Sequence, residues 1–347
     1  MASSYVMAPP YAELAANPSR TDTAGSSVAT RCGVPAPETS HTTLVHDACT
    51  RRLYTTPVQA RGPIGVFDSG VGGLSVLREI RRALPHEDVL YVADSGFAPY
   101  GDREADFIER RSDAIVRFLV REGTRAVVVA CNTATGVAID ALRARFSIPI
   151  VAIEPAIKPA AVSTRSGVVG VLATTATLSS SKFASLLDRH GAAVQVVVQP
   201  CPGLVEQVEQ GDLDGPTTRA LVARYIEPLL QQGADTLVVG CTHYTFLTPL
   251  IRACAGPEVL VIDPAPAVAR ELRRRLELEG LGPRTDGEPA TDRFWSSGPL
   301  DQAARVLGQL WAGGTVVRAL PPEFCERDAG KSGTGLGRPN FVAGIGD

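Results

Sequence analysis

The sequence has few of the features that mark several large classes of protein. It contains seven cysteines in 347 residues, scattered without metal-ligand spacing, and no CxxC. That usage fits a reducing cytoplasm better than a disulfide scaffold. No run approaches the length of a membrane span, and the amino terminus lacks the apolar core of a signal peptide. We therefore expect a cytoplasmic protein with no metal and no membrane partner.

Lysine is nearly absent, and the total charge is close to balance. The three lysines, Lys158, Lys182 and Lys331, lie in no setting that suggests a pyridoxal Schiff base, which favours a mechanism without a cofactor. A net charge of −3 gives no reason to expect a nucleic-acid partner. A hydrophobic content of 44% is ordinary for a globular protein, and the length leaves room for two domains.

The two ends of the chain differ from its centre. Residues 1–61 are rich in Ala, Ser, Thr and Pro without periodicity, and we predict a disordered extension. A start codon assigned too far upstream would look the same, and a regulatory extension is the other alternative. Residues 320–347 show no clear element, and we predict a tail. Between these ends, strands and helices alternate, which is typical of parallel sheets covered by helices on both faces.

Two similar stretches organise this central part, VVVACNTAT at 127–135 and LVVGCTHYT at 237–245. Each is a short apolar run, expected to form a buried parallel strand, that ends on a cysteine. Two more pairs repeat in the same order, IGVFD with VGVLA and IEPA with IDPA, at nearly the same spacing. The repeat predicts an α/β protein of two pseudo-symmetric domains. We expect residues 62–156 plus 265–319 in the first domain and 157–264 in the second.

The two cysteines of the repeat, Cys131 and Cys241, lie at the carboxyl ends of predicted strands, where open α/β sheets bind ligands. One such cysteine is more often a small buried residue, but two in equivalent positions favour a function. Each opens a helix, and a helix amino terminus lowers the pKa of a thiol from about 8.5. Moving a proton from one face of a carbon to the other needs two acid/base groups. The pattern predicts racemisation or epimerisation.

A glycine-rich turn, Asp68–Gly73, follows the first predicted strand and opens a helix. Its spacing fits neither GxGxxG nor a P-loop, so a nucleotide site is disfavoured. A tight turn that needs glycine is one interpretation. With Asp68 and Ser69 at the strand end, a cradle of backbone amides for a carboxylate is the other, with the acid beside it for an amino group.

Three further candidates depend on context. Pro99–Gly101 follows a strand that ends at Asp94, and a binding loop and a turn that packs its tyrosine ring are equally compatible with it. His243 lies two residues after Cys241, which favours an acid/base or orienting role. Glu209 lies in an amphipathic stretch and by itself would be part of a solvated face.

Taken together, eight stretches resemble the bacterial glutamate racemases of the cofactor-independent aspartate/glutamate racemase superfamily. The resemblance runs from Ile64 to about residue 312 and rests on DSGVGGLSVL, ADSGFAPYGDR, VVACNTAT, IEPA, GVLATTATLSS, CPGLVEQVE, GCTHY and SSG. It implies an active site in the cleft between the two domains. It also implies interconversion of L- and D-glutamate without a cofactor, which supplies D-glutamate for peptidoglycan and so for the cell wall and cell shape.

The resemblance also implies roles for single residues. Cys131 would take the proton from D-glutamate and Cys241 from L-glutamate. The matching catalytic and supporting residues are Cys131, Cys241, Asp68, His243, Asp94 and Glu209. The matching substrate-binding residues are Asp68, Ser69, Tyr100, Gly101, Asn132, Thr133, Thr174, Thr177, Thr242 and His243.

The sequence departs from the family at Thr245, where proline is common, which affects the turn more than the chemistry. An aspartate or other amino-acid racemase of the same superfamily, and a non-catalytic amino-acid sensor, are the alternatives. Whether the protein forms a homodimer stays open.

Overall fold

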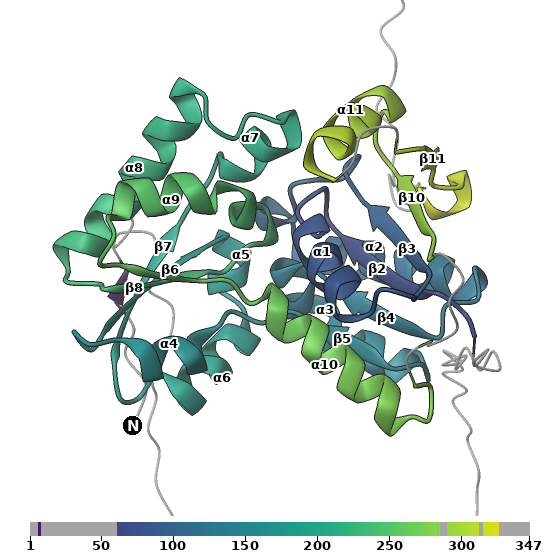
Figure 1. The fold of residues 1–347 in the computed structure, drawn as a ribbon, viewed down its shortest axis with the longest axis horizontal. Coiled ribbons are helices and arrows are strands. Elements are labelled where there is room, and N and C mark those ends of the chain that lie inside the picture. The colour runs from purple at the N-terminus through teal and green to yellow at the C-terminus, as the bar shows by residue number, and fades with distance from the viewer. Residues whose placement is uncertain (1–5, 8–60, 283, 285–289, 312–314, 326–347) are drawn as a thin grey trace, which may run out of the picture.

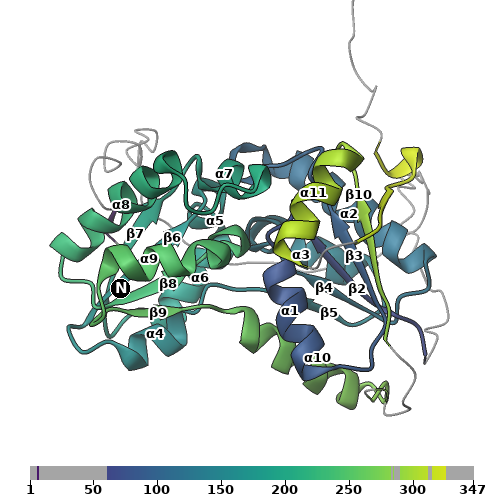
Figure 2. The same cartoon turned by 45° about the horizontal axis from the view of Figure 1, so that its top comes forward.

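The computed structural model describes residues 6–7, 61–282, 284, 290–311 and 315–325. They form two lobes that lie side by side, each built on a parallel sheet (Figures 1 and 2). Because parallel strands covered on both faces lie away from water, their sequences are nearly continuous apolar runs. The predicted α/β fold with helix-flanked parallel sheets is confirmed.

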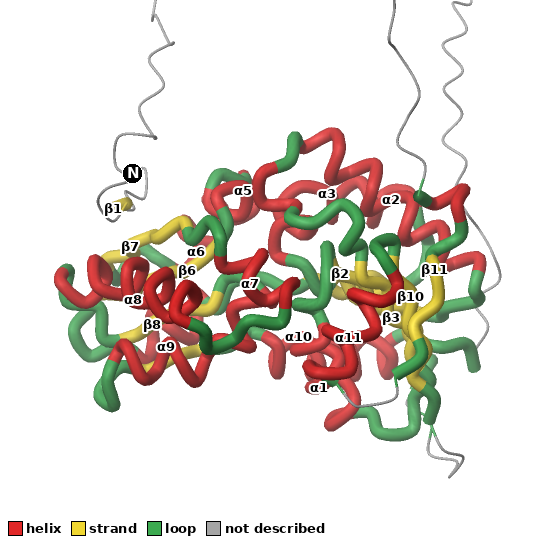
Figure 3. The backbone as a smooth tube through the Cα atoms, turned by 90° about the horizontal axis from the view of Figure 1, so that it is seen from above, coloured by secondary structure: helices red, strands yellow, loops and turns green. Residues whose placement is uncertain are grey.

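The first lobe contains a six-stranded sheet in the order β11-β10-β3-β2-β4-β5. Helices α1 and α10 pack together on one face, and α2 and α3 on the other, with α11 beside β11 (Figure 3). Its strands are β2 (Ile64–Asp68), β3 (Val89–Ala93), β4 (Ala126–Val129), β5 (Ile150–Ala152), β10 (Asp292–Ser296) and β11 (Val317–Ala319). Its helices are α1 (Leu74–Ala83), α2 (Ala105–Arg121), α3 (Asn132–Arg145), α10 (Ala265–Leu278) and α11 (Leu300–Leu310), with 3₁₀ helices η2 (Tyr100–Asp102) and η4 (Pro322–Phe324).

The second lobe contains a five-stranded sheet in the order β1-β7-β6-β8-β9. Helices α8 and α9 pack together, as do α4 and α6. Its strands are β1 (Val6–Met7), β6 (Val168–Ala173), β7 (Gln195–Pro200), β8 (Thr236–Val239) and β9 (Leu260–Ile262). Its helices are α4 (Ile157–Ser163), α5 (Thr175–Leu178), α6 (Ser181–His190), α7 (Leu204–Gln210), α8 (Pro216–Gln231) and α9 (Thr248–Ala255), with the 3₁₀ helix η3 (Thr242–Leu247).

The sequence repeat has a direct structural counterpart. The run β3-β2-β4-β5 in one sheet has the same order along the chain as β7-β6-β8-β9 in the other. The glycines eight residues before each cysteine, Gly123 and Gly233, have φ of 78° and 84° and close the helices α2 and α8. A left-handed residue at this point favours glycine because it has no Cβ. The repeat therefore specifies where each helix ends and the cysteine strand begins.

Within residues 61–282, the chain crosses between the lobes at the two copies of a second repeated motif. Residues 153–156 join β5 of the first sheet to α4 of the second lobe. Residues 262–265 lead from the end of β9 into α10, which packs on α1 of the first lobe. The proline in each copy favours an extended backbone conformation at the residue before it, and so separates the strand from the helix that follows.

The structure differs from the sequence-based prediction at both ends. Val6–Met7, within the predicted disordered extension, pairs in parallel with β7 at the edge of the second sheet. The predicted tail begins too early, since Leu320 and Phe324 are 3% and 8% exposed. The Leu320 N–H donates to Ser296 O at 2.8 Å, which ties the segment to β10. The remainder of both predictions, residues 1–5, 8–60 and 326–347, lies outside the described residues.

Candidate active site

The predicted site residues gather where the carboxyl ends of the two sheets face each other. One cavity between the lobes is lined from the first lobe by Ser69, Tyr100, Gly101, Cys131, Asn132 and Thr133, and from the second by Thr174, Cys241, Thr242 and His243. Pro99, from the candidate loop Pro99–Gly101, and Val205, which was not predicted, complete the lining. The remaining predicted residues lie behind the lining: Thr177 bonds to Thr133 and Thr174, while Asp68, Asp94 and Glu209 hold side chains or loops of the wall.

Cys131 caps the amino terminus of α3. Its Sγ accepts the Ala134 N–H at 3.4 Å, and the thiol donates to Ser69 Oγ at 3.7 Å. The expected lowering of the thiol pKa at a helix start is nevertheless wrong for Cys131. Burial and the charge of Asp68 raise the pKa of the Cys131 thiol well above its usual range and outweigh the bonds from Ala134 and Ser69. Cys131 therefore holds its proton in this structure.

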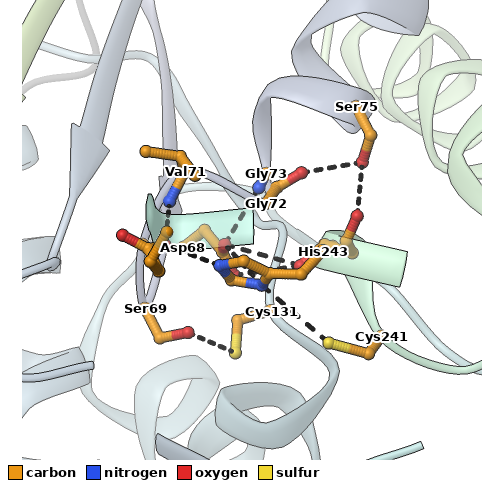
Figure 4. Close-up of polar contacts among 12 residues, drawn as sticks. Asp68, Ser69, Val71, Gly72, Gly73, Ser75, Cys131, Cys241 and His243 are labelled. Carbon is orange, nitrogen blue, oxygen red and sulfur yellow. Dashed lines mark hydrogen bonds and ion pairs between the residues drawn. The ribbon is translucent and has the colours of Figure 1, made fainter. Parts of the chain in front are cut away.

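Cys241 begins the 3₁₀ helix η3 and lies beside His243. Its Sγ is 3.9 Å from His243 Nδ1, and Figure 4 shows both cysteine side chains below the imidazole ring. Burial lowers the pKa of His243, but bonds to Cys241 and Glu209 and the charges of Asp68 and Glu209 raise it well above 6.5 overall. A protonated imidazole stabilises a neighbouring thiolate. The two sulfurs therefore lie near groups of opposite charge, the Asp68 carboxylate for Cys131 and the His243 imidazolium for Cys241.

Glu209, from α7 of the second lobe, has three partners. Its Oε1 accepts His243 Nε2–H and the Val71 N–H, both at 2.7 Å. Its Oε2 accepts the hydroxyl of Ser95 at 3.0 Å. This carboxylate therefore joins α7 to two loops of the first lobe and fixes the imidazole, a function that its amphipathic surroundings in the sequence did not indicate.

The glycine-rich turn binds protein carboxylates in this structure. Asp68 Oδ2 accepts the Gly73 N–H at 2.9 Å, and the Val71 N–H is used by Glu209. The predicted amide cradle for a substrate carboxylate is therefore wrong for these two amides. The glycines are required by close approach instead, since a Cβ on Gly72 would lie 2.3 Å from His243 Nδ1. Burial raises the pKa of Asp68 despite the nearby imidazolium.

Three threonine hydroxyls close the opposite side of the cavity. Thr133 Oγ1 of α3 lies 2.9 Å from Thr174 Oγ1 and 3.2 Å from Thr177 Oγ1, and the last two are 2.9 Å apart. The first threonine belongs to one lobe and the other two to the other. Each hydroxyl can donate one hydrogen bond and accept another, so the three threonines satisfy each other's hydrogen bonds across the cleft. The same hydroxyls can reorient toward an anionic group placed between them.

Comparison with known proteins agrees with this geometry. The model of the Asp/Glu/Hydantoin racemase family matches residues 64–272, which is more than half of the chain. The chain belongs to this racemase family. It is 57% identical over 266 residues to a glutamate racemase of Methylococcus capsulatus, a match covering 77% of the chain and 98% of that protein.

Solved structures of glutamate racemases share the fold of this racemase. The Bacillus anthracis isoform RacE1 is 31% identical, with a TM-score of 0.69, over 76% of the chain and 98% of that protein. The Escherichia coli enzyme in complex with L-glutamate and the activator UDP-MurNAc-Ala is 32% identical, with a TM-score of 0.66, over 75% and 98%. Membership of the family makes the chain an isomerase.

The cavity of this racemase is narrow in the structure. Its volume is about 10 Å³, room for a single water molecule and far less than an amino acid requires. Gly101 contributes to the close approach of the lobes, because a Cβ there would lie 2.9 Å from Thr174 Cβ across the cleft. A bound amino acid would need a wider cavity than this one. Among the described residues, no group of three or more His, Cys, Asp and Glu side chains could hold a metal ion, and no helix is long and apolar enough to cross a membrane.

Two polar residues of this racemase were missed by the sequence analysis. Ser95 holds Glu209, and Arg111 on α2 holds Asp94 through two hydrogen bonds. A signal for Arg111 was present, because it lies three residues after Ile108 and four before Ile115 on the buried stripe of its helix. A charged residue on an apolar stripe needs a partner, and the sequence did not show which one.

Proposed function

We propose that the protein interconverts L- and D-glutamate by transfer of the α-proton between two thiols. Cys131 and Cys241 both line one cavity, and each lies two residues after the equivalent strand of its lobe; this placement is the observation that carries the proposal. A thiolate takes the α-proton on one face of the substrate, and a thiol returns a proton on the other. Relatives such as the Methylococcus capsulatus and Escherichia coli proteins are glutamate racemases, which supports glutamate as the substrate.

The electrostatics of the cavity favour one resting arrangement. Cys131 is the proton donor, because burial and Asp68 raise the pKa of its thiol. Cys241, beside protonated His243, takes the proton of L-glutamate. For D-glutamate the roles reverse, and Cys131 must first lose its proton. Asp68, whose charge influences the pKa of Cys131, is the nearby group that we propose as the acceptor.

The α-proton of an amino acid is much less acidic than a thiol, so the site must stabilise the carbanion. Hydrogen bonds to the substrate carboxylate and exclusion of water provide this stabilisation. Thr133, Thr174 and Thr177 supply hydroxyls that can turn to the substrate, and Asn132 offers a buried side-chain amide that has no protein partner. Closure of the two lobes over glutamate then removes the remaining water.

Exchange of the α-proton in D₂O is the decisive test. The protein should incorporate deuterium at Cα of either enantiomer of glutamate. Incorporation into glutamate should be faster than incorporation into aspartate. Cys131→Ser and Cys241→Ser should each abolish racemisation. Each variant should still eliminate the acid HX from a glutamate analogue that carries a leaving group X, but from one enantiomer of that analogue only. Full racemase activity in either variant would refute the two-thiol mechanism, and binding of glutamate without exchange would make the protein a sensor.

The wider biological context is part of the same proposal. D-Glutamate produced here would supply peptidoglycan synthesis in the cytoplasm, and so support the cell wall and cell shape. The domains of the proposal are 62–156 plus 265–319 and 157–264, since each range contains the central strands of one sheet, with residues 320–325 added to the first and Val6–Met7 to the second.

A further inference from the structure

A buried arginine lies behind the active-site wall of the first lobe. Arg111 is 4% exposed and forms a bidentate pair with Asp94, in which Nε donates to Oδ2 at 3.0 Å and Nη2 donates to Oδ1 at 2.8 Å. Such a paired geometry fixes the plane of the carboxylate as well as its position. Asp94 itself is 0% exposed and follows directly after β3.

The carboxylate held in this way orients a residue of the cavity. Tyr100 donates its hydroxyl to Asp94 Oδ2 at 2.5 Å and lines the cavity together with Gly101 and Cys131. Burial and the charge of Asp94 raise the pKa of Tyr100 well above 10, so the phenol keeps the proton that it donates. Tyr100 packs in the hydrophobic cluster that contains Cys131, whereas Cys241 belongs to a different cluster.

Arg111 is itself fixed on its far side. Its guanidinium carbon lies 3.9 Å from the centroid of the Phe97 ring, and Nη1 donates to the carbonyl of Phe324 at 2.6 Å. Phe324 packs edge-on against Phe118 of α2 at 5.5 Å. The segment after β11 therefore belongs to the support of the active site, although it has no recognisable pattern in the sequence.

We propose that Arg111 is a positioning residue for racemisation. It acts through Asp94, which bonds the Tyr100 hydroxyl and so holds the Tyr100–Asp102 turn, with Tyr100 and Gly101 in the cavity lining, in place on the side of Cys131. The inference rests on the proposed function, because it assigns Arg111 to that same site. A merely structural ion pair would stabilise the fold and leave turnover by folded protein unchanged.

A second buried pair in the same lobe provides the matched control. Arg125 forms an ion pair with Glu87, both side chains are 1% exposed, and the pair lies at the opposite, amino end of the sheet. Arg111→Lys and Arg125→Lys both replace a planar guanidinium by a single ammonium donor and should lower the Tm. Only Arg111→Lys should lower kcat, by about 10- to 100-fold, because a small misplacement of a substrate-contacting group is costly.

The direction of the reaction supplies a second readout. If Arg111 acts on the Cys131 side, removal of deuterium from D-[2-²H]glutamate becomes more rate-limiting in Arg111→Lys. The primary isotope effect from D-glutamate should then rise relative to that from L-glutamate. Equal isotope effects, or equal losses of kcat in Arg111→Lys and Arg125→Lys, would overturn the proposal.

A double-mutant cycle with Tyr100→Phe tests the route through Asp94. Arg111→Lys should change kcat by less than about threefold in the Tyr100→Phe background, since its action requires the phenol. Full additivity of the two changes would contradict the inference. If Arg111→Lys does not fold, Phe97→Leu, which removes the ring below the guanidinium, should lower kcat with the same dependence on Tyr100. Absence of racemisation by the unchanged protein would instead refute the proposed function.

Discussion

The carboxylate of Glu209 offers the most direct test of the electrostatics around the second thiol. Glu209→Gln keeps the shape of the side chain and an oxygen that can accept the Val71 N–H. It removes the negative charge that lies 2.7 Å from His243 Nε2. We expect the pKa of His243 to fall, because bonds to Cys241 and Glu209 and the charges of Asp68 and Glu209 hold it high against burial.

The magnitude follows from the bond that is weakened. A hydrogen bond to a charged group contributes about 1.5–3 kcal/mol, so Glu209→Gln should lower the free energy of unfolding by about 2 kcal/mol. A histidine whose folded pKa is raised contributes stability that is fully present below its unfolded pKa, about 6.5, and that is lost as pH rises through the folded value. The loss should therefore be largest at pH 6 and should shrink at alkaline pH.

Denaturant unfolding at pH 6 and at alkaline pH measures this difference, and NMR titration of the His243 ring measures its cause. Glu206→Gln is the matched control, because Glu206 lies three residues earlier on α7, whereas the bonds and ion pairs of His243 are to Cys241, Glu209 and Asp68, so the change should leave both quantities unchanged. An equal loss of stability at both pH values, or an unchanged titration of His243, would refute the assignment of Glu209 as its counter-charge.

Two further predictions concern the turn after β2. Gly70→Ala places a Cβ 1.8 Å from Glu209 Oε1, so it should displace Glu209 and lower kcat/KM by at least about tenfold. The control, Gly308→Ala in α11, meets no atom within 4 Å and should stabilise the fold by about 0.5–1 kcal/mol. Equal activity in the two variants would contradict the close approach. Besides burial, the charge of Asp68 raises the pKa of the Cys131 thiol, so Asp68→Asn should lower that pKa. Alkylation of Cys131 by iodoacetamide at pH 8, measured by peptide mass spectrometry, should therefore be faster in Asp68→Asn. An unchanged or slower rate would show that Asp68 does not hold the proton on Cys131.

The sequence by itself determined the elements and their repeat. Short Val-rich runs ending on Cys131 and Cys241 became β4 and β8, and the glycines before them adopt the left-handed conformation that ends a helix. These features are local, because hydrophobic period and backbone preference act over a few residues. Motif resemblance then placed the residues of both lobes in one site, where the structure finds most of them.

Only the tertiary structure decided what each polar group bonds to. The Val71 amide meets Glu209, 138 residues away, so the turn that resembled an anion cradle holds a carboxylate of the protein itself. Burial and Asp68 reverse the expected direction of the Cys131 pKa. The partners of Arg111 lie on two other segments, the loop after β3 and the predicted tail. Burial and distance between residues far apart in the chain set these properties, and no local pattern encodes them.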